Sequence, residues 1–264
     1  MISWLEVVIL IVSGVLVGFI NTLAGGGSII SLSILMFLGL PANLANGTNR
    51  VAIFLQNIAA VGSFKQKKVL DHKKGFWLAI PATLGSIIGA WIAVDINEEI
   101  IEKAIAIVML IMMIVILYKP QRWLKGKVEL QQKKVTIGQM ILFFAIGIYG
   151  GFLHMGVGYA LLAGIVLGAG YDLVKANAIK VFVILIWSPV ILIVFIINDQ
   201  VNFLYGIILS AGNVIGALVA SRLAVKQGAG FVRWVIIAVI LITAAHVFGL
   251  VDFGNLLNFE PVDP

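Results

Sequence analysis

The sequence contains no cysteine and little charge, with Asp, Glu, Lys and Arg making up 11% of its 264 residues. Without cysteine the chain cannot form disulfides, thiolate metal sites or cysteine nucleophiles. All twelve acidic residues lie between apolar runs or at their ends, so a carboxylate proton relay or an acidic cation site within a membrane is not expected. Phosphate-binding loops, HExxH helices and nucleophile elbows are absent as well. We therefore predict no catalytic residue, no metal site and no cofactor.

Apolar residues dominate instead. They make up 61% of the chain, and its mean hydropathy is +1.12. Soluble domains are roughly half apolar and about a quarter charged, so the expected solvent is a bilayer. A spanning helix needs about 20 apolar residues, which leaves room for roughly eight to ten membrane segments. The first apolar run has no positive region before it and is too long for a signal peptide, so we expect it to remain as the first helix.

The apolar runs fall into two groups of five around a basic stretch at 119–134, which predicts an all-α membrane protein of about ten segments. The segments are expected at 4–24, 28–40, 44–64, 76–94, 100–118, 137–153, 158–169, 176–197, 203–222 and 231–250. The predicted organisation is a first transmembrane repeat at 1–118, a cytoplasmic linker at 119–136 and a second transmembrane repeat at 137–264.

The two groups also resemble each other in sequence. Asn46 corresponds to Asn177, and two longer matches flank this pair on either side. The flanking matches are Gly18-Phe19-Ile20-Asn21 with Gly151-Phe152-Leu153-His154, and Gly85-Ser86-Ile87-Ile88-Gly89-Ala90 with Gly212-Asn213-Val214-Ile215-Gly216-Ala217. Three matches in the same order indicate an internal duplication.

Loop charges predict the orientation of the segments. The stretches 65–74, 119–134 and 222–233 hold most of the Lys and Arg, so they are expected in the cytoplasm, and no nucleic-acid partner is needed to explain the net charge of +6. The stretches 95–103, 198–202 and the C-terminal tail are poor in Lys and Arg, so they and both termini are expected outside. The equivalent loops 95–103 and 222–233 then face opposite sides, which makes the repeat inverted.

The short segments 28–40 and 158–169 would reach only about 18 Å, less than the hydrocarbon core of roughly 30 Å. We expect each to form a broken hairpin with the preceding helix, buried in protein or lining a cavity. Exposed backbone N–H groups and a helix N-terminus suit an anion, although glycines also permit tight helix packing. The candidate substrate-binding residues at the two breaks are Asn21, Thr22, Gly25, Gly26, Gly27 and Ser28, and His154, Met155, Gly156 and Gly158.

His154 is the one ionisable group expected at mid-membrane, where such groups are functional candidates. The alternative is a neutral imidazole hydrogen-bonded to a backbone carbonyl. Further polar residues open the third segment of each repeat, and they could line the path to the breaks. These are Asn46, Thr48, Asn49 and Arg50 in the first repeat and Asn177 and Lys180 in the second. Arg50 and Lys180 would then attract anions from opposite faces of the membrane, or they would snorkel to lipid phosphates.

The runs GFINTLAGGGSIISLSIL, LPANLANGTNR and VLDHKKGFWLAIPATLGSIIGAWIA, followed by a second copy that ends in GNVIGALVASRLA, resemble the sulfite exporter TauE/SafE family of membrane permeases. The resemblance covers nearly the whole chain. The second copy has Gly156-Val157-Gly158 where the first has a glycine triplet. The resemblance implies transport of small sulfur-containing anions such as sulfite, thiosulfate or organosulfonates, usually outward.

We therefore expect a secondary anion transporter in the plasma (inner) membrane that works by alternating access. Its expected partners are a small anionic substrate and membrane lipid. Whether it forms a homo-oligomer is left undecided by the sequence. Export needs no coupling ion, although proton coupling through His154 is an alternative. The rival functions are a passive anion channel and an intramembrane sulfur-transfer enzyme, and the lack of cysteine and of an acid/base pair counts against the enzyme.

Overall fold

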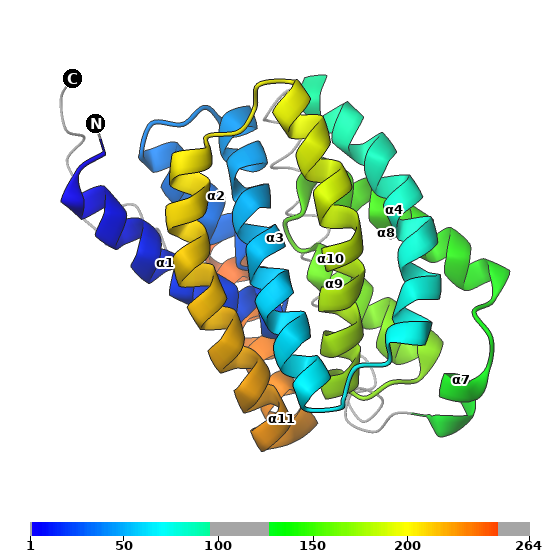
Figure 1. The fold of residues 1–264 in the computed structure, drawn as a ribbon. Helices are drawn as coiled ribbons and strands as arrows, with labels where there is room; N and C mark the ends of the chain where they lie inside the picture. The colour runs from blue at the N-terminus through cyan, green and yellow to red at the C-terminus, as the bar shows by residue number, and fades with distance from the viewer. Residues whose placement is uncertain (1, 96–126, 248–264) are drawn as a thin grey trace.

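The computed structural model describes residues 2–95 and 127–247, and every regular element within these two ranges is helical (Figure 1). The elements in chain order are α1 (Trp4–Leu23), α2 (Ser28–Phe37), α3 (Ala42–Gln66), α4 (His72–Asp95), α7 (Val128–Gln132), α8 (Ile137–Leu153), α9 (Val157–Ala163), the π-helix η1 (Gly164–Gly168), α10 (Leu173–Ile197) and α11 (Phe203–Val247). The predicted segment 100–118 and residues 119–126 of the predicted linker lie outside the described residues.

The predicted segments 203–222 and 231–250 both lie in α11, which consists of two helices that meet at a kink at Gly228. Gly228 has φ 78° and ψ −174°, a conformation that glycine adopts without steric cost. One residue therefore turns the chain where the Lys and Arg content of 222–233 suggested a loop.

Several helices begin at side-chain caps that can be read from the sequence. Ser3 and Thr136 each form a capping box, with Glu6 and Gln139 respectively, so each pair satisfies two backbone N–H groups that lack a partner in the first turn. Asp172 accepts hydrogen bonds from the first N–H groups of α10. These caps fix the starts of α1, α8 and α10.

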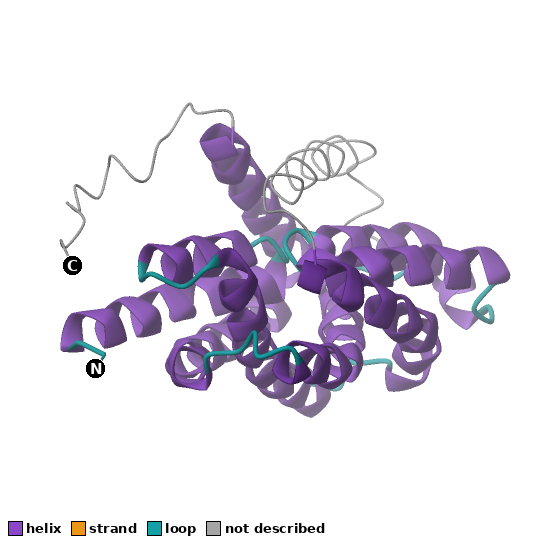
Figure 2. Ribbon diagram, turned by 90° about the horizontal axis from the view of Figure 1, so that it is seen from above, coloured by secondary structure: helices purple, strands orange, loops and turns teal. Residues whose placement is uncertain are grey.

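The helices pack in pairs around a central layer (Figures 1 and 2). α1 packs along α11 and α4 along α8, while α3 and α10 contact each other at the centre and connect the two pairs. Glycines make both pairings close: a methyl group on Gly18 would meet the backbone of Asn213 in α11, and one on Gly151 would meet the backbone of Ser86 in α4. Small residues allow this approach in membrane bundles, where van der Waals packing holds helices together.

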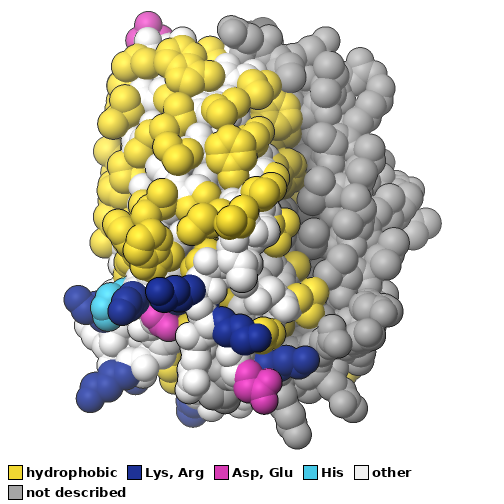
Figure 3. Space-filling view, turned by 90° about the vertical axis from the view of Figure 1, so that its right-hand side faces the viewer, with side chains coloured by type: hydrophobic (Ala, Val, Ile, Leu, Met, Phe, Trp, Pro, Cys, Tyr) yellow, Lys and Arg dark blue, Asp and Glu magenta, His cyan; other side chains and the backbone are white. Residues whose placement is uncertain are grey.

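Four of the described helices are long and apolar enough to cross a membrane. They are α1, residues His72–Val94 of α4, α10, and residues Phe203–Val239 of α11. Figure 3 shows a continuous band of hydrophobic side chains on one face of the molecule, with Lys and Arg gathered at one end of the band. The chain is therefore built as a multi-pass membrane protein.

α3 differs from these four helices although its 25 residues would reach about 37 Å. It carries many polar side chains, including Asn49, Arg50, Gln56 and Asn57, and these are buried inside the protein. The polar residues of α3 thus face the interior, where they find protein partners in place of lipid.

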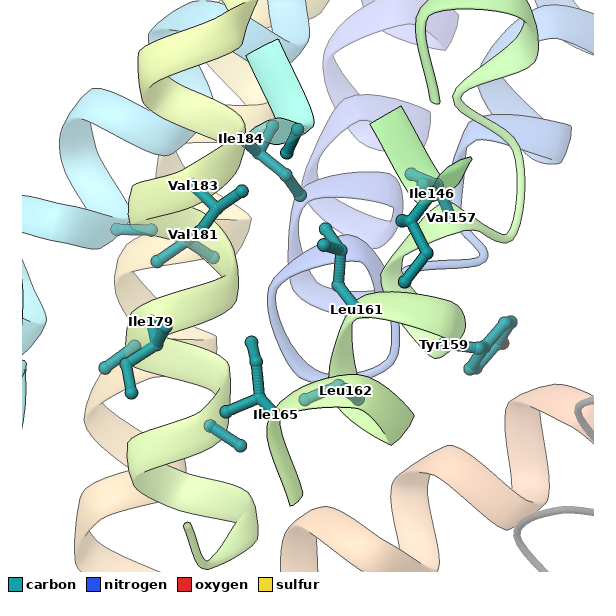
Figure 4. Packing of buried hydrophobic residues seen from close by; sticks show 14 of the residues in the cluster. Ile146, Val157, Tyr159, Leu161, Leu162, Ile165, Ile179, Val181, Val183 and Ile184 are labelled. Carbon is teal, nitrogen blue, oxygen red and sulfur yellow. The ribbon is translucent and has the colours of Figure 1, made fainter. Parts of the chain in front are cut away.

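The largest apolar cluster surrounds α9, η1 and α10, and Trp187 of α10 is its largest fully buried side chain. In Figure 4, Leu161 and Ile165 lie toward α10, whereas Tyr159 extends from α9 away from them. This cluster holds α9 and η1, which are too short to cross a membrane, inside the bundle.

Candidate functional site

The two predicted chain breaks exist and touch each other. α1 ends at Leu23 and α2 begins at Ser28, while α8 ends at Leu153 and α9 begins at Val157. Gly25 has φ +100°, and a methyl group placed on it would meet the Cα atom of Gly158. The reverse holds as well, since a methyl group on Gly158 would meet the Cα atom of Gly25. Backbone therefore packs on backbone where the two breaks cross.

Tyr159 stands at this crossing, although the sequence did not single it out. A methyl group on Gly26 would meet its hydroxyl oxygen and ring. The tyrosine is buried, and its hydroxyl has no hydrogen-bond partner among the described residues. Its position directly after Gly158 is the one signal that could have drawn attention to it.

Lys180 binds the end of α1. Its side chain is 0% exposed, and its Nζ donates to the carbonyl oxygens of Asn21 at 3.0 Å and Thr22 at 2.9 Å. Both carbonyls belong to the last turn of α1, where no intrahelical N–H is available to them. Lys180 is therefore enclosed at the first break, which contradicts the alternative that it snorkels to lipid phosphates.

Arg50 binds the end of α8 in the same way. It is 2% exposed, and it donates from Nη1 to the carbonyl oxygen of Gly150 at 2.8 Å and from Nη2 to that of Gly151 at 2.9 Å. Its guanidinium carbon also lies 5.3 Å from the ring centre of Phe195, a distance that permits a cation–π contact. The snorkelling alternative is wrong for Arg50 too.

The other candidates on α3 divide according to helical periodicity. Asn46 and Asn49 lie on the Arg50 side of the helix: Asn46 donates to the carbonyl oxygen of Phe152 at 3.3 Å, and the Asn49 side-chain oxygen accepts from Ser31 at 2.8 Å. Thr48 points elsewhere, because it lies about 200° around the helix from Asn46. Its hydroxyl accepts the Asn202 N–H at 2.9 Å in the α10–α11 connection, so the structure does not bring Thr48 to the breaks.

His154 caps α8 in the left-handed conformation, with φ 34°, and is buried. Its ring lies edge-on to that of Trp187, with 6.2 Å between the ring centroids. Its Nδ1 has no hydrogen-bond partner in the described residues, so this nitrogen does not make the bond to a backbone carbonyl that was the alternative. The neighbouring Met155 takes part through its carbonyl oxygen, which accepts the Tyr149 hydroxyl at 2.5 Å.

Buried polar atoms without a partner in the described part of the chain gather around the breaks. Natural proteins leave few such atoms, so their concentration at one place indicates a site for a polar ligand or water. They include Asn21 Oδ1, Thr22 Oγ1, Asn49 Nδ2, Arg50 Nε, His154 Nδ1, Tyr159 OH, both side-chain amide atoms of Asn177, and Trp187 Nε1. Trp187 joins Tyr159 as a residue that the sequence did not identify, because a tryptophan within a helix usually belongs to a core or an interface belt.

The charge at the breaks has one sign. Arg50 and Lys180 are buried there, and no Asp or Glu is among the buried side chains of residues 2–94 and 127–239 whose burial is described. The same residues contain no cluster of His, Asp or Glu that could hold a metal ion. The arrangement is suited to a small anion and unsuited to a cation.

Short polar contacts hold the connections at the two ends of the bundle. At the end where Lys and Arg gather, Tyr171 donates to the Asp71 carboxylate at 2.5 Å, and the Lys74 backbone N–H donates to it at 2.9 Å. Burial alone would raise the pKa of Asp71, but these hydrogen bonds and the nearby charges of His72 and Lys74 hold it below its usual value. At the opposite end, the side chain of Gln200 donates to the Val94 carbonyl oxygen at 3.4 Å.

Apolar spanning helices around a buried, cation-bearing break in each half define this chain as a multi-pass membrane transporter. Residues 10–247 match the family model described as "Sulfite exporter TauE/SafE". The chain therefore belongs to the sulfite exporter TauE/SafE family, as its sequence motifs predicted.

Curated relatives agree with this assignment. A "Probable membrane transporter protein" of Haemophilus influenzae is 24% identical over 241 residues, which cover 91% of this chain and 94% of the relative. "Probable membrane transporter protein YfcA" of Escherichia coli K12 is 26% identical over 250 residues, covering 93% and 90%, and "YunE" of Bacillus subtilis is 24% identical over 260 residues, covering 88% and 95%. No solved structure matches the chain. All three relatives are named as probable membrane transporters, and the family is one of exporters, which agrees with the prediction that this chain is not an enzyme.

Proposed function

We propose that this chain is a secondary transporter that exports small sulfur-containing anions, such as sulfite, thiosulfate or organosulfonates, by alternating access. The observation that carries the proposal is the meeting of the two breaks inside the protein, between Gly25 and Gly158. Two buried cations and many unpartnered polar atoms surround this point, with no buried carboxylate among the described residues. An anion that lost its water here would find donors on several sides.

The proposed substrate contacts come from both breaks. One group comprises the backbone of Gly25, Gly26 and Gly27 with the side chains of Asn21, Thr22 and Ser28, and the opposite group comprises His154, Gly156 and Gly158. Asn49 and Asn177 add side-chain amides whose nitrogen has no described partner. To the contacts expected from sequence we add Tyr159 and Trp187, because each presents a buried donor that has no partner within the described part of the chain.

An inverted repeat of the two halves is part of the proposal, and the packing supports it. α1 of the first half packs on α11 of the second, and α4 of the first packs on α8 of the second. Arg50 of the first half binds the break of the second, while Lys180 of the second binds the break of the first. A pseudo-two-fold axis in the membrane plane would relate each of these contacts to the other, as in many alternating-access transporters.

The direction of transport follows from the membrane potential. If the end with the Lys and Arg cluster faces the cytoplasm, export of each negative charge from the inside-negative cell releases about 2.3 kcal/mol of free energy per 100 mV of membrane potential. That is enough to hold a concentration ratio of several tens without a coupling ion. Inward movement of a proton through His154 in exchange for the anion would add to this driving force, and the pH dependence of flux would reveal it.

The test is a flux assay with the purified protein in proteoliposomes and sulfite or thiosulfate inside. A carrier gives flux that saturates with substrate and exchanges label across the bilayer. Conductance that rises linearly with substrate concentration would show that the protein is a passive channel and not a carrier. Saturable flux of an unrelated anion with neither sulfite nor thiosulfate transported would overturn the proposed substrate class.

A further inference from the structure

The ends of α1 and α8 create an electrostatic problem for the proposed anion site. Both helices run into the interior and end there with their carbonyl groups, at Leu23 and Leu153. Each helix C-terminus carries a partial charge of about −0.5. Two such ends would therefore place about one negative charge beside the point where the breaks meet, and an anion would be repelled.

Arg50 and its neighbours satisfy the whole last turn of α8. The Gly150 and Gly151 carbonyls accept the guanidinium as described above, and Gly150 also accepts the His154 N–H at 3.1 Å. The Phe152 carbonyl accepts Asn46 at 3.3 Å and Arg50 Nη2 at 3.4 Å. The Leu153 carbonyl accepts the backbone N–H of Met155. Both Nη atoms of Arg50 are thus bound to the helix end.

The end of α1 is satisfied by the equivalent device. The Ile20 carbonyl accepts the N–H groups of Ala24 at 2.7 Å and Gly25 at 3.0 Å. The next two carbonyls, of Asn21 and Thr22, accept Lys180. Lys180 lies 159 and 158 positions along the chain from its partners Asn21 and Thr22. Arg50 lies 100 and 101 positions from Gly150 and Gly151, the partners in its two shortest contacts. Each cation therefore reaches across from the opposite half of the molecule.

We propose that Arg50 and Lys180 are positioning residues that fasten and neutralise the broken helix ends of the opposite half, so that the crossing of the breaks can receive an anion. The inference rests on the proposed anion transport and deepens it. With two cations against the two helix ends, the net charge near the crossing changes from about −1 to about +1. The anion is then contacted by neutral donors such as the Tyr159 hydroxyl and the Trp187 N–H, and not by either cation.

A pair of substitutions at each position separates positioning from direct contact. R50K keeps a cation that can bind two carbonyls, as Lys180 does, but it loses Nε of Arg50, which has no partner among the residues that the structure describes. R50Q loses the charge. K180R and K180Q make the same comparison at the other break. Lys65→Gln on α3 and Lys175→Gln on α10 are matched controls, since both lysines are exposed on the same helices.

The first measurement is the dissociation constant of thiosulfate for the full chain in lipid nanodiscs. We expect R50Q and K180Q to weaken binding at least tenfold, and R50K, K180R and both controls to stay within about threefold of the unmodified protein. Binding lost equally in R50K and R50Q would show that the guanidinium itself contacts the anion, which would overturn the positioning role. Unchanged binding in both glutamine variants would overturn it as well.

The second measurement needs no substrate. Each substitution should speed backbone amide hydrogen exchange in the opposite half of the molecule. Exchange should become faster at 150–156 in R50Q, although the substitution lies in the first half, and at 20–25 in K180Q, although the substitution lies in the second half. Exchange that rises throughout the bundle, or beside the substituted residue alone, would contradict the inference. If the unmodified protein binds no sulfur anion, the proposed function fails, and the exchange pattern still decides the role of the cations. If a glutamine variant does not insert into the membrane, the conservative variant at the same position, R50K or K180R, is used for both the affinity and the hydrogen-exchange measurement.

Discussion

Replacing Gly25 by alanine should force the two breaks apart. A Cβ atom at this position would meet the Cα atom of Gly158, and it would lie 2.9 Å from the Gly158 carbonyl carbon and 3.0 Å from its nitrogen. These are backbone atoms, so no side chain can rotate away. Residue 25 must also hold φ +100°, which disfavours any residue with a Cβ atom.

The expected loss of stability follows from these two effects. Overpacking of a filled interior costs typically about 1–3 kcal/mol, and a left-handed backbone conformation costs a non-glycine residue roughly 1–2 kcal/mol. Gly25→Ala should therefore lose about 2–5 kcal/mol if the backbone does not move. Gly62→Ala is the control, because Gly62 lies within α3 and an added Cβ would have no described atom within 4 Å apart from its chain neighbours and the backbone of its own helix. Alanine favours a helix interior over glycine by about 1 kcal/mol, so this control should be as stable as the unmodified protein or more stable.

The measurement is the melting temperature of each variant in nanodiscs, followed by tryptophan fluorescence, together with the affinity for thiosulfate. The double variant with Gly158→Ala adds a sharper test. A Cβ atom on Gly158 would occupy the same contact from the other side. Once the first substitution has separated the breaks, the second should cost less than it does alone, by about 0.5–3 kcal/mol. Additive losses, or a Gly25→Ala protein that melts with the Gly62→Ala control, would refute the contact between the breaks.

Three further predictions concern other parts of the molecule. Tyr159→Phe removes one buried donor and keeps the ring, so thiosulfate affinity should fall about fivefold to tenfold, the equivalent of roughly 1 kcal/mol for a hydrogen bond, and an unchanged dissociation constant would remove Tyr159 from the site. Because the pKa of Asp71 is lowered in the folded protein, its carboxylate contributes fully to stability above its usual pKa of 3.8, and this contribution is lost as the pH falls through the lower folded value. Tyr171→Phe removes one of the hydrogen bonds responsible, so the melting temperature of this variant should fall less at acid pH than that of the unmodified protein. Plots of melting temperature against pH that coincide for the two proteins would contradict this. Single cysteines in this cysteine-free chain test orientation: Lys68→Cys should be shielded from an impermeant thiol reagent added outside and Asp199→Cys should react, and labelling of both from the same side would contradict the assigned topology.

The sequence predicted those features of the fold that depend on local patterns. The apolar runs located α1, α4, α8 and α10 to within a few residues. The glycine-rich stretches located both breaks, because glycine interrupts a helix where a left-handed residue or a close backbone contact is required. Gly228 marks the kink between the two helices of α11, within the charged stretch 222–233 that the sequence placed between two segments.

The roles of individual side chains at the breaks depended on contacts between distant parts of the chain. Arg50 and Lys180 were candidates from their place near the starts of α3 and α10, but their carbonyl partners lie at least 100 residues away. Thr48 was a candidate beside Asn46 and Arg50, yet its direction around α3 takes it to the α10–α11 connection. Tyr159 was passed over because a tyrosine among apolar residues has no distinctive pattern until the chain that faces it is known.

The polar interior of α3 has a consequence for biosynthesis. A charged residue in a spanning helix costs up to about 2.5–3.5 kcal/mol during insertion, the value for the helix centre. The carbonyl groups that bind Arg50 belong to Gly150 and Gly151 of α8, which lie 100 and 101 residues after it in the chain. At a translation rate of about 5–20 residues per second, α3 waits roughly 5–20 seconds for that partner. During this interval the guanidinium must be sheltered by the translocon, an insertase or the headgroup region. Assembly of the bundle is therefore ordered in time: the first half cannot reach its final packing until the ribosome has delivered the beginning of the second.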